Sequence, residues 1–170
     1  VGRSAVLGAI AIDRPALFLQ GTLLGVSVLA TLLMAQRVSD GSGLAAFTPQ
    51  AATVPGSAAE QVALKAGVTQ TEVFPLAMFA LGGMMLFGAS DDLLTMFVAL
   101  EVLSLPLYLM CGLARRNRLL SQEASLKYFL LGAFSSAFFL FGAAMLYGYS
   151  GSLRLSGIAA GRGPASLALI

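Results

Sequence analysis

Runs of about twenty apolar residues are the feature that most constrains how this chain folds, because a helix of that length crosses the hydrocarbon core of a bilayer. Four such runs follow one another and predict membrane-spanning helices over residues 16–37, 72–89, 91–113 and 122–148. The chain is 58% hydrophobic and 11% charged, whereas a soluble domain is typically about 25% charged. We therefore expect an all-α, polytopic transmembrane helix bundle that forms one membrane domain over residues 1–170.

The segments between and before these runs differ in kind. Residues 1–12 include an apolar stretch too short to cross a membrane alone, and we expect them to be the end of an earlier helix. The short polar segments 13–15 and 90–92 predict tight turns between antiparallel neighbours. Residues 38–71 are rich in Ala, Gly, Thr, Gln and Pro, which predicts a loop outside the membrane with a short helix near 57–66.

Basic residues predict which side of the membrane each loop faces, because cytoplasmic loops carry an excess of Lys and Arg. If successive helices alternate in direction, six basic residues collect on one side and three on the other. The larger set is Arg3, Arg37, Lys65, Arg115, Arg116 and Arg118, and the smaller set is Arg14, Arg154 and Arg162. Loops 38–71 and 114–121 are therefore expected in the cytoplasm.

Glu101 lies near the middle of the third apolar run, roughly 15 Å along a helix from Asp91 and roughly 21 Å from Arg115. An ionisable side chain at this depth costs at least about 2.5–3.5 kcal/mol on insertion scales, and such residues usually have a function. Helical spacing puts Ser104 and Tyr108 on the same face, so the three make a polar stripe on an apolar helix. Glu101 either holds a transferable proton or is a neutral carboxyl group that hydrogen-bonds a neighbouring helix.

Lys127 lies a little over one turn into the fourth apolar run. It can take part in a proton relay, or its ammonium group can snorkel to the membrane interface as an anchor; the residues alone leave both open. Glu123 lies four residues earlier on the same helix face and is placed to pair with Lys127. Asp91 and Asp92 begin the third run, where a carboxylate suits the N-terminus of a helix.

Small residues in the second and fourth runs are typical of helices that pack closely in a membrane. They are Gly82, Gly83, Gly88, Gly132, Gly142, Ser135 and Ser136.

Composition excludes several classes of protein and site. The net charge of +2 provides no basic field for a nucleic acid. With no histidine, the chain cannot build a His-based metal site or a Ser-His-Asp triad, and the single Cys111 cannot form an internal disulfide. No redox cofactor ligands are evident, so any electron transfer would take place in partner subunits.

Two stretches together carry a resemblance to a known family: "LFGASDDLLTMFVALEVLSLPLY" at 86–108 and "EASLKYFLLGAFSSA" at 123–137. They closely resemble subunit N of bacterial NADH-quinone oxidoreductase, or respiratory complex I, the counterpart of mitochondrial NADH dehydrogenase subunit 2. The match runs over about 80–155. The resemblance implies an antiporter-like fold with inverted repeats, of which this chain covers about the second to the sixth transmembrane helices.

The resemblance also implies a function and its residues. The buried glutamate of the family falls on Glu101 and the motif lysine falls on Lys127, the groups through which such subunits move a proton. Ser104, Tyr108 and Glu123 are then candidate relay residues. Quinone reduction would occur in partner subunits, which hold NADH, flavin, iron-sulfur clusters and quinone. Expected partners are the other membrane subunits of the complex, including neighbouring antiporter-like subunits, and lipid of the bacterial plasma membrane.

Two other functions remain open from the sequence. One is a subunit of a multisubunit cation/proton antiporter, which shares the helix–glutamate–lysine layout. Co-purification with hydrophilic iron-sulfur and flavin subunits would separate it from complex I. The other is a structural membrane subunit that transfers no proton, which loss of pumping in an assembled Glu101→Gln variant would exclude.

Overall fold

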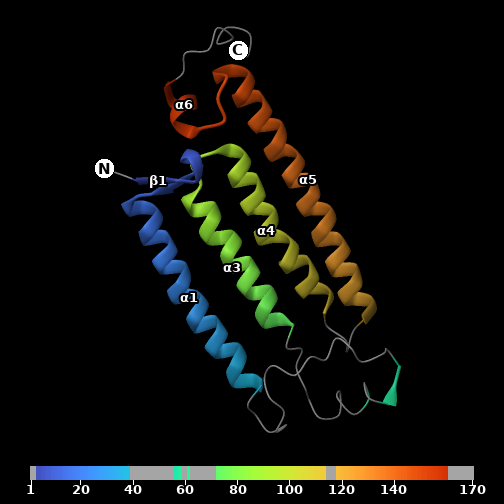
Figure 1. Cartoon of the computed structure of the whole chain (residues 1–170). Coiled ribbons are helices and arrows are strands. Elements are labelled where there is room, and N and C mark those ends of the chain that lie inside the picture. The colour runs from blue at the N-terminus through green and yellow to red at the C-terminus, as the bar shows by residue number, and fades with distance from the viewer. Residues whose placement is uncertain (1–2, 39–55, 59–60, 62–71, 114–117, 161–170) are drawn as a thin grey trace.

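The computed structural model describes residues 3–38, 56–58, 61, 72–113 and 118–160. Four long helices dominate this part of the chain and run antiparallel to their neighbours (Figure 1). They are α1 (Arg14–Val38), α3 (Val73–Ala89), α4 (Leu93–Gly112) and α5 (Arg118–Ser150). The predicted fold class, a bundle of transmembrane helices, is confirmed, and each helix begins and ends within four residues of its apolar run.

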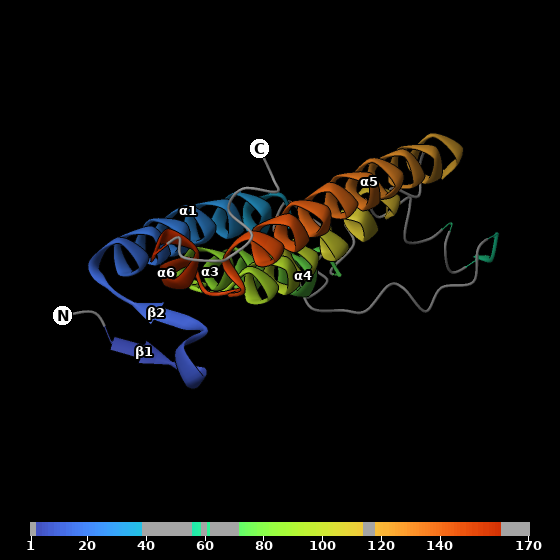
Figure 2. The same ribbon diagram turned by 90° about the horizontal axis from the view of Figure 1, so that it is seen from above.

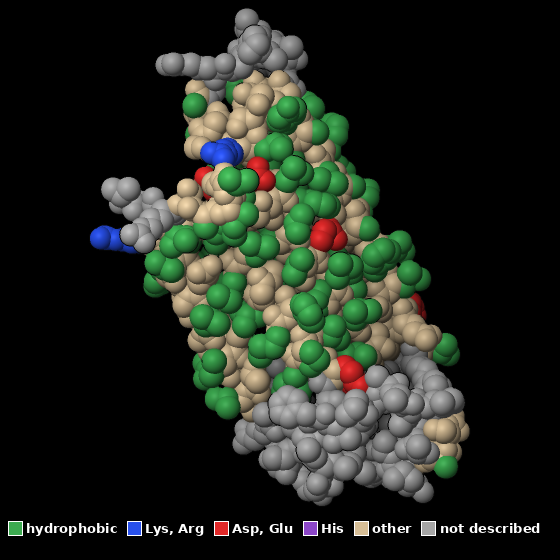
Figure 3. Space-filling model, in the orientation of Figure 1, with side chains coloured by type: hydrophobic (Ala, Val, Ile, Leu, Met, Phe, Trp, Pro, Cys, Tyr) green, Lys and Arg blue, Asp and Glu red, His purple; other side chains and the backbone are tan. Residues whose placement is uncertain are grey.

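Length and hydropathy fit these helices to a bilayer. By these two criteria α1, α4 and α5 can each cross a membrane, and α3 is an apolar helix of 17 residues, roughly 25 Å long. α5 has 33 residues and is therefore roughly 50 Å long, well beyond the hydrocarbon core. Apolar side chains are spread along the described face in Figure 3, with few charged ones among them. Such a surface suits a membrane, where a helix bundle needs no polar exterior.

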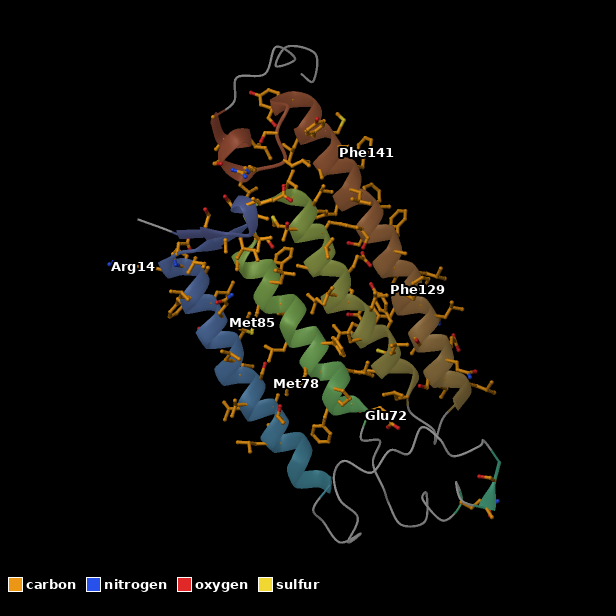
Figure 4. The ribbon with its side chains drawn as sticks, viewed as in Figure 1. Arg14, Glu72, Met78, Met85, Phe129 and Phe141 are labelled. Atoms are coloured by element: carbon orange, nitrogen blue, oxygen red, sulfur yellow. The ribbon has the colours of Figure 1, made fainter. Side chains whose placement is uncertain are left out.

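The order of packing is simple and decides what surrounds each helix. α3 packs against α1 and α4, and α5 packs against α4, so α4 has a helix on each side. The side-chain amide of Gln20 donates to the backbone carbonyl of Met85 at 3.3 Å, which links α1 to α3. Arg14 and Glu72, at the starts of α1 and α3, mark opposite ends of the bundle (Figure 4).

At Gly83 the backbones of α3 and α4 lie close together. This glycine is buried, and a Cβ atom at this position would lie 2.4 Å from the backbone nitrogen of Leu103 and 2.9 Å from the carbonyl carbon of Val102. Only glycine leaves room for the two backbones at this distance. Gly82, the preceding residue, is exposed, and a Cβ there would meet nothing within 4 Å.

The helix ends have ordinary causes. The Asp92 carboxylate accepts hydrogen bonds from the backbone N–H of Thr95 at 3.1 Å and from its hydroxyl group at 3.2 Å, which caps α4. This confirms the predicted capping role of one of the two aspartates. Pro75 lies in the first turn of α3, where its missing N–H has no intrahelical partner to lose.

The interpretation of residues 1–12 as the end of a helix is wrong for the part that the structure describes. Strand β1 (Arg3–Ala5) pairs antiparallel with β2 (Ile10–Ile12), and the 3-10 turn η1 (Val6–Gly8) joins them. This hairpin lies to one side of the helices in Figure 2. The backbone N–H of Asp91 donates to the carbonyl of Ala9 at 2.8 Å. The segment before α4 therefore supplies a hydrogen bond to the backbone of the hairpin.

The same end of the bundle holds a second backbone contact. Leu93 N–H donates to the Leu153 carbonyl at 3.0 Å, and Leu155 N–H donates to the Asp91 carbonyl at 3.1 Å, just before the short helix α6 (Leu155–Ala160). The Arg154 guanidinium group donates to the carbonyl of Leu7 in the hairpin turn. These hydrogen bonds connect three segments that are distant in the sequence: the hairpin, the start of α4 and the residues before α6.

The hairpin also changes the count of basic residues. Arg3 lies at the same end of the bundle as Arg14, because only the short hairpin, and no long helix, separates them. With Arg3 moved, the larger of the two sets of basic residues has five members and the smaller set has four. The group Arg115, Arg116 and Arg118, close together in the sequence, remains the reason to expect that end in the cytoplasm.

Candidate functional site

Glu101 lies near the middle of α4, roughly 12 Å from Leu93 and roughly 17 Å from Gly112 along the helix axis. Its side chain is half-buried and turned toward α5, where its Oε1 atom accepts a hydrogen bond of 2.5 Å from the hydroxyl group of Ser136. The carboxyl group is therefore held in a helix–helix contact at mid-span. It does not project freely into the lipid.

The contact surface between α4 and α5 contains a line of hydroxyl groups that cross from α5 to α4. Ser121 donates to the carbonyl of Cys111 at 2.6 Å, and Ser125 donates to the carbonyl of Tyr108 at 2.7 Å. Ser136 continues the line at the level of Glu101. Because the residue numbers rise on one helix as they fall on the other, these bonds fix one antiparallel register between the two helices.

The aromatic residues of this contact surface follow the same register. The Phe97 and Phe139 rings stack with centroids 6.2 Å apart, beyond Glu101 toward the hairpin end. Tyr108 is 7% exposed and meets the rings of Tyr128 and Phe129 edge-on, with centroid distances of 4.8 and 5.7 Å. Phe141 instead points from α5 away from the other helices (Figure 4). The α4–α5 contact thus has aromatic side chains on both sides of Glu101.

The predicted polar stripe is only partly assembled. Glu101 and Tyr108 both face α5, as the spacing predicts. Ser104 lies between them, but its hydroxyl group donates to the carbonyl of Leu100 in its own helix at 2.7 Å. A serine bonded in this way offers its proton to the backbone and not to Glu101.

Lys127 is placed away from Glu101. Its ammonium group pairs with the Glu123 carboxylate at 2.5 Å, as the spacing of four residues predicts, and the two side chains are 68% and 56% exposed. Nine residues separate Lys127 from Ser136, which corresponds to about half a turn around α5 and roughly 14 Å along it. Lys127 therefore lies on the face of α5 opposite to the one that meets Glu101.

Within the described part of the chain, Glu101 forms no ion pair, and no group of three or more His, Cys, Asp or Glu side chains is placed to hold a metal ion. α3, the other helix beside α4, contains no Asp, Glu, Lys or Arg between Val73 and Ala89. The polar partner that the structure gives the Glu101 side chain is Ser136. Sequence reasoning assigned Ser136 to helix packing only, although its spacing from Gly132 along one face of α5 could have indicated the α4 contact.

The Tyr108 side chain of α4 lies directly against Gly132 of α5. A Cβ atom there would lie 1.8 Å from the Tyr108 hydroxyl oxygen, so Gly132→Ala has to displace a buried ring that two other aromatic side chains surround. Overpacking of this kind costs about 1–3 kcal/mol. We expect a lower thermal unfolding midpoint for the intact protein in mild detergent.

The matched control is Gly142→Ala in the same helix, where a Cβ atom would meet nothing within 4 Å. Alanine favours a helix over glycine by up to about 1 kcal/mol, so this variant should equal or exceed the original protein in stability. Equal midpoints for the two variants would contradict the placement of Tyr108 against Gly132.

Comparison with known proteins gives a consistent family. Residues 90–168 match the family model described as "NADH:quinone oxidoreductase/Mrp antiporter, TM". The chain is 65% identical to NADH-quinone oxidoreductase subunit N of Mycobacterium tuberculosis (strain ATCC 25618 / H37Rv), a match that covers 92% of this chain and 32% of that protein. It is 62% identical to subunit N of Rhodococcus opacus (strain B4), with the same two coverages.

Among solved structures, the chain matches respiratory complex I from Thermus thermophilus with bound Aureothin at 38% identity and a TM-score of 0.48, over 89% of this chain and 35% of that chain. The chain spans about a third of the length of the curated relatives that it matches. Over the third of subunit N that it spans, this chain is similar to NADH-quinone oxidoreductase subunit N, at 65% identity.

Proposed function

We propose that this chain is part of a proton-translocating membrane subunit of NADH-quinone oxidoreductase, and that Glu101 is the residue that takes up and releases the proton. The observation that carries the proposal is the position of Glu101: a half-buried carboxyl group near the middle of an apolar helix, held between helices by a hydroxyl donor. Ionisable groups at this depth are costly to insert and typically mark ion or proton pathways.

The chemistry required of this chain is limited to proton transfer. Quinone reduction and the flow of electrons from NADH through flavin and iron-sulfur clusters belong to partner subunits of the complex, which also include neighbouring antiporter-like subunits. Glu101 would take up or release its proton when the charge near it changes, because charges interact strongly where water is scarce. The site belongs to the plasma membrane of a bacterium, with the connections at 38–71 and 114–121 in the cytoplasm.

The experiment that tests the proposal is proton pumping by the assembled complex with Glu101→Gln. Undiminished pumping would contradict it. A multisubunit cation/proton antiporter is the second candidate, since the matching family model covers both groups. Curated relatives at 57–65% identity carry the name of the oxidoreductase subunit, which favours the first candidate.

Lys127 is proposed as a second charged group of the pathway, acting through the ion pair with Glu123. Lys127→Ala removes the positive charge, and we expect pumping to fall severalfold without being abolished, because Lys127 does not contact Glu101 within the described residues. Lys127→Arg keeps the charge and should retain most of the pumping. Normal pumping by Lys127→Ala would instead assign this residue to anchoring at the membrane interface.

A further inference from the structure

We propose that Ser136 is a positioning residue for proton transfer: its hydroxyl group holds the Glu101 carboxyl group against α5 in both of its charge states. This inference rests on the proposed function of Glu101 and adds a second residue to it. The contact that supports it is the 2.5 Å hydrogen bond from Ser136 Oγ to Glu101 Oε1 across the α4–α5 contact surface.

The hydroxyl group of Ser136 is used differently from most hydroxyl groups in these helices. Serine and threonine in a helix commonly donate to the carbonyl four residues earlier. Thr22, Thr31 and Ser104 all do so, at 2.7–2.9 Å. A hydroxyl group has one proton to donate. Ser136 donates it to a side chain of another helix, whereas these three residues donate it to the backbone of their own helix.

A hydroxyl group suits a carboxyl group that changes charge. When Glu101 is ionised, it can only accept hydrogen bonds, and Ser136 donates to it. When Glu101 is protonated, its O–H can donate to the lone pairs of the Ser136 oxygen. The pair can therefore stay bonded through proton uptake and release, which a donor-only side chain such as Lys or an acceptor-only backbone carbonyl would not allow.

The surroundings make the loss of this bond consequential. Aromatic contacts lie on both sides of Glu101 along α4–α5, and α3 carries no charged residue. Within the described part of the chain, no other side-chain donor is bonded to Glu101. Removing the Ser136 hydroxyl group would leave the carboxyl group free to rotate out of its transfer geometry.

The test compares Ser136→Ala with Ser135→Ala in the intact complex. Ser135 is the neighbouring residue of the same type, but its side chain is exposed in the described structure and outside the α4–α5 contact. We expect Ser136→Ala to lower proton pumping roughly tenfold, the order expected for one hydrogen bond to a charged group. Ser135→Ala should pump normally, and Ser136→Thr, which keeps the hydroxyl group, should restore most of the activity.

An infrared measurement separates positioning from a merely structural role. The carboxyl band of Glu101, identified as the band missing in Glu101→Gln, should move to higher wavenumber in Ser136→Ala because the carboxyl group loses its hydrogen bond. It should stay in place in Ser135→Ala. An unmoved band in Ser136→Ala, or normal pumping by that variant, would overturn the inference, even where Glu101→Gln is inactive and the proposed function therefore stands.

Discussion

Glu101→Gln is expected to abolish proton pumping, with a loss of roughly 100-fold or more, while the complex still assembles. Glutamine has nearly the same shape as glutamate, and its amide can keep a hydrogen bond to Ser136, so the α4–α5 contact should persist. It cannot take up or release a proton near neutral pH. Loss of a proton-transferring group typically costs 10²–10⁴-fold in rate. The measurement is NADH-driven acidification of inverted membrane vesicles, normalised to the amount of assembled complex.

Two variants make this result specific. Glu123→Gln removes the same charge from an exposed side chain of α5 that does not contact Glu101, and it should reduce pumping far less. Glu101→Asp retains a titrating group but shortens the reach to Ser136, and it should pump at an intermediate rate. If Glu101→Gln pumps as well as the unchanged protein in an assembled complex, Glu101 is structural and the proposed function is wrong.

The helices were predictable from the sequence because a single physical demand dominates them. A backbone in lipid must satisfy its own hydrogen bonds, and an apolar run long enough to cross the bilayer has few alternatives to a helix. The ends were predictable where a local cause exists, such as the carboxylate of Asp92 at the start of α4. Both features depend only on residues close together in the chain.

The hairpin at residues 3–12 was not predictable on the same basis. Val6 and Leu7 adopt positive φ angles of 53° and 56°, which side chains of their kind rarely favour, so neither of these two residues signals a turn. What supports the turn comes from distant parts of the chain: the guanidinium group of Arg154 on the carbonyl of Leu7, and the backbone of Asp91 on that of Ala9. Local propensity cannot report such contacts.

The candidate site was also predictable only where its features depend on residues close together in the chain. The depth of Glu101 and its pairing face follow from helical spacing, and so does the Lys127–Glu123 ion pair. Ser136 could not be assigned to Glu101 because its role depends on the register between α4 and α5, which neither helix encodes alone. Ser104 shares a face with Glu101, but its hydroxyl group bonds its own backbone, a choice that spacing does not decide.

Gly83→Ala is expected to prevent assembly of the bundle, because the added methyl group has no space between α3 and α4. The atoms that it would meet, at 2.4–2.9 Å, all belong to the backbone of Val102 and Leu103 and cannot rotate away as a side chain can. The two helices would have to separate at the level of Glu101. Overpacking costs about 1–3 kcal/mol where side chains can adjust, and here we expect at least the upper end of that range.

The adjacent glycine provides the comparison that isolates this clash. Gly82→Ala adds the same methyl group to the same helix, at an exposed position with nothing within 4 Å, and should leave the amount of assembled complex in the membrane unchanged. Both substitutions gain the same helix propensity, so only the position of the methyl group relative to α4 differs. Normal assembly and pumping by Gly83→Ala would mean that α3 and α4 do not meet at this glycine. The placement of α4, which carries Glu101, between α3 and α5 would then be wrong.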